Sequence, residues 1–98
     1  MIRLNAFFEL KDGVSAEQLT AITNELVEQS RRDEGCKGYD LFRSTTNPQV
    51  FMFCESWEND ECLEKHSAAP HFMSAVPQIG PLTKDGLKIE RYDKKFKV

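Results

Sequence analysis

Apolar and polar residues alternate along four stretches of the chain, which is the two-residue period of a β-strand. The first stretch carries apolar side chains on both of its faces, because Phe7 and Phe8 are neighbours and point in opposite directions. A strand of this kind is expected to be covered on both sides. The predicted strands are residues 2–10, 38–45, 50–57 and 87–92.

Helical spacing and capping residues predict a helix between the first two strands. Ser15 and Gln18 have the spacing of a capping box, in which each side chain bonds a backbone N–H group of the other residue. Apolar residues then recur on one stripe from Leu19 to Leu26. Gly35 is the expected stop, because glycine readily adopts the left-handed conformation that ends many helices.

A second helical region is expected between the third and fourth strands. Asn59 is its predicted N-terminal cap, and residues 68–69 interrupt it. Pro70 suits the first position of a further short helix, which we expect to run to Val76. Pro77 then begins a predicted loop.

The resulting order, β-α-β-β-α-β, predicts a single α+β domain over residues 1–98. A ferredoxin-like, four-stranded antiparallel sheet with its helices on one face is the simplest way to bury these elements. The second face of the sheet would then leave apolar side chains in water, which favours a partner sheet. We therefore expect a homodimer in which two sheets pack face to face and form a shared α+β barrel.

Composition limits the possible binding partners of the chain and the cellular compartment expected for it. The 13 basic and 16 acidic residues are mixed along the chain, and no basic patch with interleaved aromatics indicates nucleic-acid binding. No apolar run reaches the length of a membrane span, and the N-terminus lacks the apolar region of a signal peptide. Cys36, Cys54 and Cys62 form no CxxC pair, so we expect free thiols in the cytoplasm, and the sequence assigns them no role.

Candidate chemistry is concentrated where the third strand ends and the helices begin. Residues 55–72 include Glu55, Trp57 and both histidines, so this rim of the sheet is the expected place for a pocket. His66 is the candidate general base, since a neutral imidazole with a pKa of about 6.5 accepts a proton at neutral pH. The alternative is a structural histidine that bonds across the seam between sheet and helix.

Three further residues are candidates for the site, and each has a structural alternative. Glu55 could orient His66 and fix its tautomer, or it could be a buried carboxylate bonded to the backbone or to a neighbouring strand. Trp57 could stack on a planar substrate or pack in the core. Asn5 could hydrogen-bond a substrate carbonyl or an oxyanion, because a short amide has little structural reason to lie beside Phe7.

The predicted short helix adds two residues to the candidate pocket. His71 and Phe72 follow Pro70 in its first turn, where they could line the mouth of the pocket. The alternative for His71 is a bond to the backbone. His66 and His71 lie on either side of the helix break, and no third ligand stands at a suitable spacing, so no metal site is predicted.

Three short segments around this region form a recognisable pattern. They are Gly35-Cys36-Lys37-Gly38-Tyr39, Glu55-Ser56-Trp57-Glu58 and Ala69-Pro70-His71-Phe72. The pattern resembles the antibiotic biosynthesis monooxygenase family, and the resemblance extends over residues 4–92. It implies a dimeric α+β barrel with one pocket per subunit between sheet and helices. Relatives of this kind oxidise phenols and quinols with O2, without a metal or a flavin.

The resemblance also implies which residues form the site. The positions that match the family's pattern are Asn5, Glu55, Trp57, His66, His71 and Phe72. One departure concerns haem. Members that degrade haem carry an iron-binding histidine where this chain has Val76 and a tryptophan where it has His66, which argues against haem binding.

The resemblance therefore implies a cofactor-independent monooxygenase that oxidises a small aromatic quinol or phenol, with O2 as the second substrate. The predicted catalytic residues are His66 and Glu55. The predicted substrate-binding residues are Asn5, Trp57, His71 and Phe72. Two alternatives stay open: an isomerase or lyase that moves protons with the same histidine and glutamate, and a non-catalytic, ligand-binding dimer related to stress.

Overall fold

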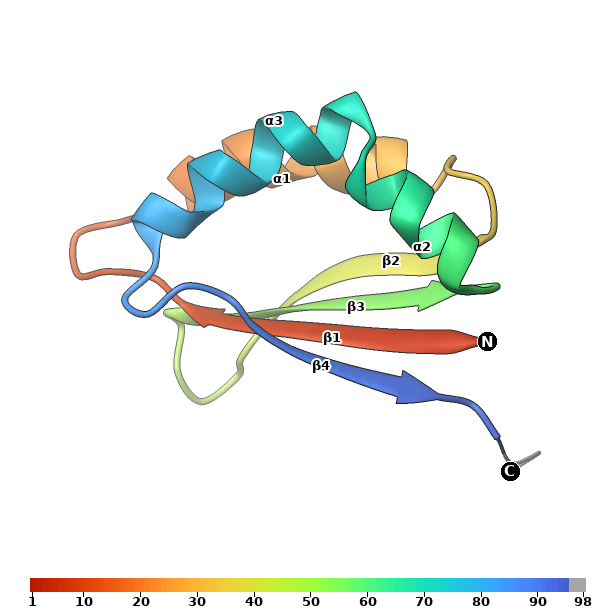
Figure 1. The fold of residues 1–98 in the computed structure, drawn as a ribbon. Coiled ribbons are helices and arrows are strands. Elements are labelled where there is room, and N and C mark those ends of the chain that lie inside the picture. Colours follow the sequence, from red (N-terminus) through yellow and green to blue (C-terminus); the bar gives the residue numbers. More distant parts are fainter. Residues whose placement is uncertain (96–98) are drawn as a thin grey trace.

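The computed structural model describes residues 1–95, which form four strands and three α-helices. In chain order the elements are β1 (Ile2–Glu9), α1 (Ala16–Ser30), β2 (Cys36–Arg43), β3 (Val50–Trp57), α2 (Asp60–Ser67), α3 (Pro70–Ile79), the 3₁₀ turn η1 (Gly80–Leu82) and β4 (Lys88–Asp93). The helices form one layer over a single sheet (Figure 1). None of the helices within residues 1–95 has the length and hydropathy needed to cross a membrane.

The sheet is antiparallel throughout, with the strand order β2-β3-β1-β4. β1 and β3 lie at its centre, and their register pairs Ile2 with Trp57 and Leu4 with Glu55. The three α-helices cover the same face of the sheet (Figure 1). This arrangement confirms the predicted ferredoxin-like α+β fold, in which an apolar sheet face is buried against helices.

Polar caps begin the first two helices where the sequence predicts them. The Ser15 hydroxyl accepts the Gln18 N–H at 3.2 Å, and the Gln18 side chain accepts the Ser15 N–H at 2.8 Å, which completes a capping box. Asn59 caps α2 by accepting the Cys62 N–H at 3.0 Å. Each cap of this kind contributes about 1 kcal/mol to stability.

The core lies between the helices and the face of the sheet that they cover, which we call the inner face. Phe8 and Phe51 stack there with ring centroids 5.7 Å apart. Leu19 and Leu26 bring α1 against the same buried cluster. Because full burial of one leucine contributes about 1.5–3 kcal/mol, this stripe is sufficient to orient α1 on the sheet.

The loop between α1 and β2 packs tightly against α2. Gly35 has φ +74°, and a Cβ atom at this position would overlap the Cys62 thiol. The Gly35 carbonyl also accepts the Glu58 N–H at 2.8 Å. Glycine is therefore needed for a left-handed backbone and a close approach rather than as a helix stop, since α1 already ends at Ser30.

The last helix is longer than the sequence predicts. α3 continues past Val76, through Pro77, to Ile79, where a loop was expected. A proline inside a helix costs about 3 kcal/mol, because it removes a backbone hydrogen bond and crowds the preceding turn. Ile79 is fully buried, and burial of a side chain of this size contributes about 1.5–3 kcal/mol, which offsets most of that cost.

Strand ends differ from the predicted ones by one or two residues. β1 ends at Glu9 rather than at residue 10, and β4 is Lys88–Asp93 rather than 87–92. β2 is Cys36–Arg43 rather than 38–45. A bulge between Cys36 and Gly38 explains the early start, because it interrupts the alternation from which the strand was predicted.

The second face of the sheet, which we call the open face, has no helices over it. Phe7, Met52 and Phe42 are paired neighbours on this face, and Tyr92 lies on it at the outer strand. Phe42 is 52% exposed and Tyr92 is 50% exposed. A surface of this kind suits a partner sheet, and dimerisation stays a prediction.

Candidate active site

Strand β3 and the two helices after it direct polar side chains into the space between sheet and helices. Glu55 and Trp57 share the inner face of β3, because side chains two residues apart in a strand point the same way. His66 lies on the buried side of α2, one turn after Cys62. His71 stands in the first turn of α3.

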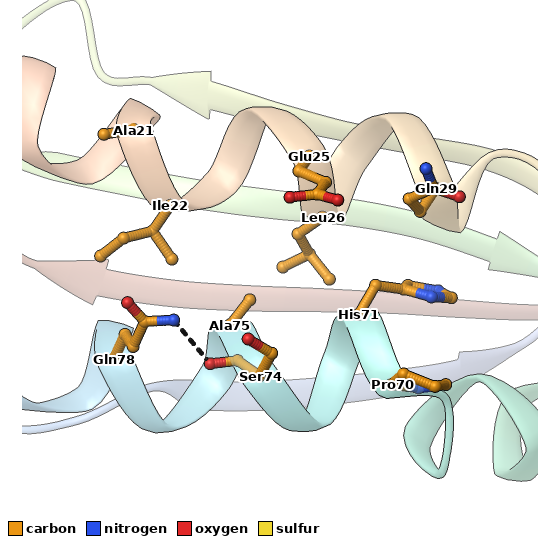
Figure 2. A pocket seen from close by; sticks show the side chains of 10 residues that line it. All are labelled: Ala21, Ile22, Glu25, Leu26, Gln29, Pro70, His71, Ser74, Ala75 and Gln78. Carbon is orange, nitrogen blue, oxygen red and sulfur yellow. Dashed lines mark hydrogen bonds between the residues drawn. The ribbon is translucent and has the colours of Figure 1, made fainter.

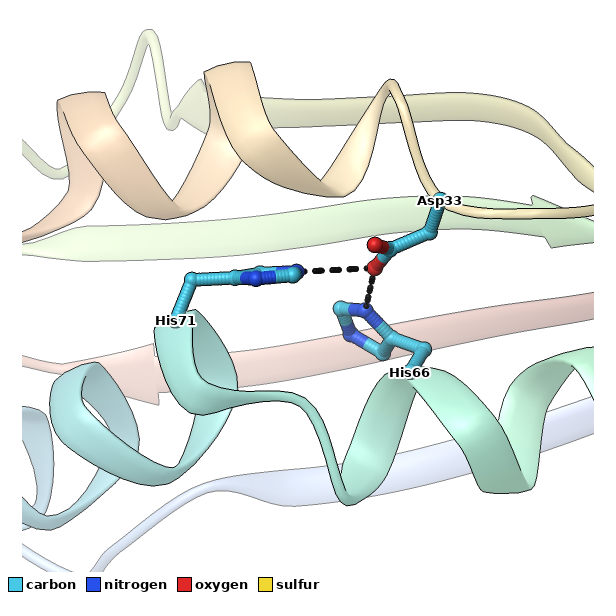
Figure 3. Close-up of side chains that lie close together, drawn as sticks. All are labelled: Asp33, His66 and His71. Atoms are coloured by element: carbon cyan, nitrogen blue, oxygen red, sulfur yellow. Dashed lines mark hydrogen bonds and ion pairs between the residues drawn. The ribbon is translucent and has the colours of Figure 1, made fainter.

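Asp33, in the loop after α1, joins the two histidines. Its Oδ2 atom accepts a hydrogen bond from His66 Nδ1 at 2.8 Å and a second from His71 Nε2 at 2.8 Å (Figure 3). A carboxylate only accepts hydrogen bonds, so each of these ring nitrogens carries its proton. The proton of a neutral His66 therefore sits on Nδ1, and its Nε2 presents a lone pair.

The Nε2 atom of His66 is buried and has no hydrogen-bond partner among residues 1–95. Glu55 Oε1 lies 4.0 Å from this atom, which is beyond hydrogen-bond range. Buried polar atoms are nearly always hydrogen-bonded, so an unpartnered one calls for an explanation. A substrate group bound beside Nε2 is one such explanation.

His66 and Glu55 both line a cavity of about 160 Å³. Apart from His66 and Glu55, the side chains in its walls are mostly apolar, among them Leu63, Phe72 and Val76. An apolar cavity of about 150 Å³ is known to hold benzene, so the space suits a ligand with a single aromatic ring. The site thus combines a shaped apolar volume with one lone pair and one carboxyl group.

Burial controls the charge of Glu55. The loss of water around this carboxyl raises its pKa from 4.5 to about 7, although the indole N–H of Trp57 donates to Oε1 at 3.0 Å and acts in the opposite direction. At neutral pH Glu55 is therefore divided between its acid and its carboxylate form. A carboxyl in this state can give or take a proton.

Burial acts on His66 as well. It lowers the pKa of the imidazole, while the hydrogen bond and charge of Asp33 act in the opposite direction. The neutral ring is thus favoured, and Asp33 stands ready to stabilise the imidazolium if Nε2 takes a proton. Because burial favours the neutral form of both His66 and Glu55, the 4.0 Å approach between them is not an ion pair.

The structure places Trp57 behind the cavity rather than in it. Its side chain is fully buried, and its ring lies 4.5 Å from the ring of His66. Its only polar group already bonds Glu55, and it is not among the cavity-lining side chains. The predicted stacking on a substrate is thus replaced by a supporting position beneath the acid and the base.

Asn5 is separated from the other predicted site residues. It pairs with Cys54 across β1 and β3 and lies on the open face, where it accepts a hydrogen bond from Arg3 Nε at 3.1 Å. Its neighbours Leu4 and Ala6 are the residues of β1 that line the cavity. The predicted convergence of Asn5 with the indole and imidazole is wrong, because adjacent side chains of a strand point to opposite faces.

His71 and Phe72 diverge at the start of α3. Phe72 lines the cavity, and its ring lies 5.1 Å from that of His66 in an edge-on arrangement. His71 instead lines a wider groove of about 420 Å³ between α1 and α3 (Figure 2). Polar side chains such as Gln29 and Ser74 border that groove, and none of its residues leaves a buried polar atom without a partner.

Asp33 is the site residue that sequence reasoning missed. It belongs to no helix or strand, and 33 positions separate it from His66 along the chain. The sequence feature that could have indicated this contact is Gly35, because a glycine followed directly by a strand can mark a loop in close contact with another element. Nothing in the local pattern says that this element is α2.

Comparisons with known proteins identify the family of this chain. A model of the antibiotic biosynthesis monooxygenase family matches residues 1–78. The chain is 29% identical to YcnE of Bacillus subtilis over 91 residues, which cover 93% of this chain and 95% of that protein. YcnE is provisionally named a monooxygenase. The chain is also 29% identical over 76 residues to an uncharacterised protein of Synechocystis, of which it spans only 52%.

A solved structure extends the likeness to three dimensions. The crystal structure of a Bacteroides thetaiotaomicron protein superposes on this chain with a TM-score of 0.83. The two proteins are 37% identical, and the alignment covers 93% of this chain and 94% of the other. That protein is described as having an unknown function and as a possible oxidoreductase.

Proposed function

The chain belongs to the antibiotic biosynthesis monooxygenase family, and from this premise we propose that it is a cofactor-independent monooxygenase that oxidises a small aromatic quinol or phenol with O2. The observation that carries the proposal is the buried, unpartnered Nε2 of His66, a residue that lines an apolar cavity. A ring hydroxyl of the substrate would supply the missing hydrogen bond.

In the proposed reaction His66 acts as the general base. Nε2 takes the proton of the ring hydroxyl, and the imidazolium that forms is stabilised by Asp33 at Nδ1. The electron-rich ring then reduces O2 directly. A hydroquinone and O2 give a hydroxyquinone and water, and this conversion balances without another reductant because the hydroquinone supplies the electrons.

The remaining residues of the site would hold and place the substrate. Glu55 would place its carboxyl group beside the base, 4.0 Å from Nε2, and Phe72 would pack against the substrate ring. Trp57 would keep Glu55 in position through the indole hydrogen bond. His71 would act through Asp33 rather than through the substrate, since it donates to the same oxygen atom as His66.

Oxygen uptake tests the proposal. Single-ring and two-ring hydroquinones would be offered to the protein in metal-free buffer that contains EDTA, and O2 consumption would be followed with an electrode. His66→Ala should lower turnover at least ~100-fold, because a positioned base contributes about 10²–10⁴. Asn5→Ala, on the open face, is the matched control and should keep its activity. Undiminished turnover in His66→Ala would remove His66 from the mechanism.

One observation favours a second function. Glu55 and His66 form an acid–base pair in which burial favours the neutral forms, and such a pair can move a proton between two substrate atoms without O2. An isomerase or lyase would use it in this way. Turnover that persists in the absence of O2 would favour this function over the monooxygenase.

We also propose a homodimer that acts in the cytoplasm. The apolar side chains of the open face, Phe42 and Tyr92 among them, would pair with the same face of a second copy. The three cysteines are unpaired, which fits a reducing compartment. Sedimentation at micromolar concentration would test the dimer, and a monomer under those conditions would contradict it.

A further inference from the structure

Asp33, His66 and His71 bring three metal-ligand atoms together. Asp33 Oδ2, His66 Nδ1 and His71 Nε2 lie within 4.8 Å of one another, and they come from three separate segments of the chain (Figure 3). The sequence lacked a third ligand for its two histidines, and the fold supplies one. Two imidazoles and a carboxylate are a ligand set that Zn²⁺ commonly uses, with a fourth position left for water or another ligand.

We propose that this cluster, the Asp33–His66–His71 site, binds a divalent cation of the Zn²⁺ type. The proposal goes beyond the monooxygenase function and does not depend on it. The nitrogen-rich donor set selects late first-row metals such as Zn²⁺ and Co²⁺ over Mg²⁺, which prefers oxygen ligands.

The present geometry must rearrange to become a coordination site. Both histidine nitrogens point at one oxygen atom from 2.8 Å, and the three ligand atoms lie within 4.8 Å of one another. Around a tetrahedral Zn²⁺ with bonds of about 2.0–2.1 Å, neighbouring ligand atoms are ~3.3 Å apart, so Oδ2 must move about half an ångström from each nitrogen, and the two nitrogens must approach each other by as much as ~1.5 Å. Asp33 can supply the first of these movements, because it lies in a loop rather than in a helix or strand.

A second observation points to the same ligand. The Nε2 atom of His66 is buried without a partner, and Glu55 Oε1 stands 4.0 Å away from it. A cation on Nδ1 would force the ring proton onto Nε2, which would then be a donor facing that carboxyl group. Histidine ligands of metals usually donate their second N–H to a carboxylate or carbonyl in this manner.

A bound cation would compete with the proposed reaction. It would occupy Nδ1 of His66, and the proton displaced to Nε2 would remove the lone pair that the proposed reaction uses. His71 gives the cation a route of entry, because its ring lies both in the cluster and on the groove between α1 and α3 (Figure 2). Zn²⁺ is therefore expected to inhibit turnover while it stabilises the folded chain.

Equilibrium dialysis against ZnCl2, after treatment with EDTA, tests the site without any substrate. The wild-type protein should retain one Zn²⁺ per chain and should not retain Mg²⁺. His71→Ala and Asp33→Asn should each weaken Zn²⁺ binding by at least about tenfold, since changes even outside the ligand set have effects of this size. Co²⁺ should give the visible absorption of a tetrahedral site in the wild type and not in these variants.

Two controls separate this site from other donors. Glu34→Gln removes the adjacent carboxylate, which is exposed and pairs with Lys65 at 2.9 Å, and should leave Zn²⁺ binding unchanged. Cys36→Ser combined with Cys62→Ser should also bind normally. The proposal is overturned if the wild type retains no stoichiometric Zn²⁺, if folded His71→Ala and Asp33→Asn bind as the wild type does, or if the cysteine variant loses the metal. None of these outcomes bears on O2 uptake in EDTA.

Discussion

The two faces of the sheet are built from the same strands, yet they carry different chemistry. On the inner face, Glu55 and Trp57 are buried beneath the helices beside a cavity and an unpartnered imidazole nitrogen. On the open face, Asn5 bonds an exposed arginine, and Phe42 is half exposed. The difference arises from burial, because removal of water is what shifts the protonation of an acid or a base and leaves room for a ligand.

The largest effect that separates the two faces is expected from a matched pair of phenylalanines. Phe53→Ala, on the inner face, should destabilise the chain by about 3–5 kcal/mol, because the ring is 2% exposed and packs against Phe8 and Tyr39. Phe42→Ala, on the open face, should cost less than about 1 kcal/mol in a dilute sample. Urea denaturation measures both values.

The stability costs of these two variants should also depend differently on protein concentration. If the open face pairs with a second copy, the cost of Phe42→Ala should grow as the protein concentration rises, whereas the cost of Phe53→Ala should stay constant. Equal costs for the two variants at the lowest measurable concentration would show that the faces do not differ in burial.

A smaller effect, with a dependence on pH, is expected at Glu55. Folding raises its pKa from 4.5 to about 7, so the native chain holds a proton that the unfolded chain releases between these values. The stability that this group contributes is fully present below pH 4.5 and is lost as the pH rises to 7. Glu55→Gln should abolish this loss of stability, and the free energy of unfolding at pH 8 should rise by roughly 3 kcal/mol.

Thermal unfolding between pH 4 and pH 8 measures this change. The stabilities of Glu55→Gln and wild type should agree most closely at pH 4 and should diverge as the pH increases. Glu90→Gln, on the exposed outer strand β4, is the matched control and should follow the wild type within about 0.5 kcal/mol. A pH-independent offset in Glu55→Gln would mean that the carboxyl has the same pKa in the folded and unfolded states.

Sequence reasoning predicted the strands and helices that build the site but not everything that reaches it. The Ser15–Gln18 capping box and the alternation of residues 50–57 depend on contacts within one element, so the local pattern was enough to predict them. Glu55 and His66 were expected at one rim of the sheet because the second helix follows the third strand directly, and their side chains do approach to 4.0 Å. The extension of α3 through Pro77 depends on burial of Ile79, which no local pattern reports.

The wrong placement of Asn5 and the omission of Asp33 also arise from contacts between separate elements. Periodicity groups Asn5 with Phe7, but it cannot say which of the two faces the helices will cover. Asp33 reaches His66 only because Gly35 allows the loop to approach α2. That contact joins distant segments, so it follows from the completed fold rather than from the spacing of residues in the chain.

An intermediate effect on activity is expected at Asp33. Asp33→Asn keeps the size of the side chain but removes its charge, so the Nδ1–H tautomer of His66 is no longer enforced and the imidazolium loses its partner. Turnover in EDTA should fall by about 10–100-fold, which corresponds to roughly 1.4–2.7 kcal/mol. Glu34→Gln, at the next position, should keep full turnover. Unchanged activity in Asp33→Asn would show that His66 needs no orientation.

The smallest effect is expected at Asn5, and it tests the assignment of faces directly. Asn5→Ala removes only an exposed hydrogen bond with Arg3, so stability should change by less than about 0.5 kcal/mol and turnover should not change. Leu4→Asn moves the amide by one residue to the inner face, where it would stand in the cavity wall opposite Glu55. That variant should lose about 1–3 kcal/mol of stability and much of its turnover, because a polar group replaces an apolar side chain in the cavity wall. If Asn5→Ala proves the more damaging change, the amide must touch substrate, and the face of β1 that serves the site would have to be reassigned.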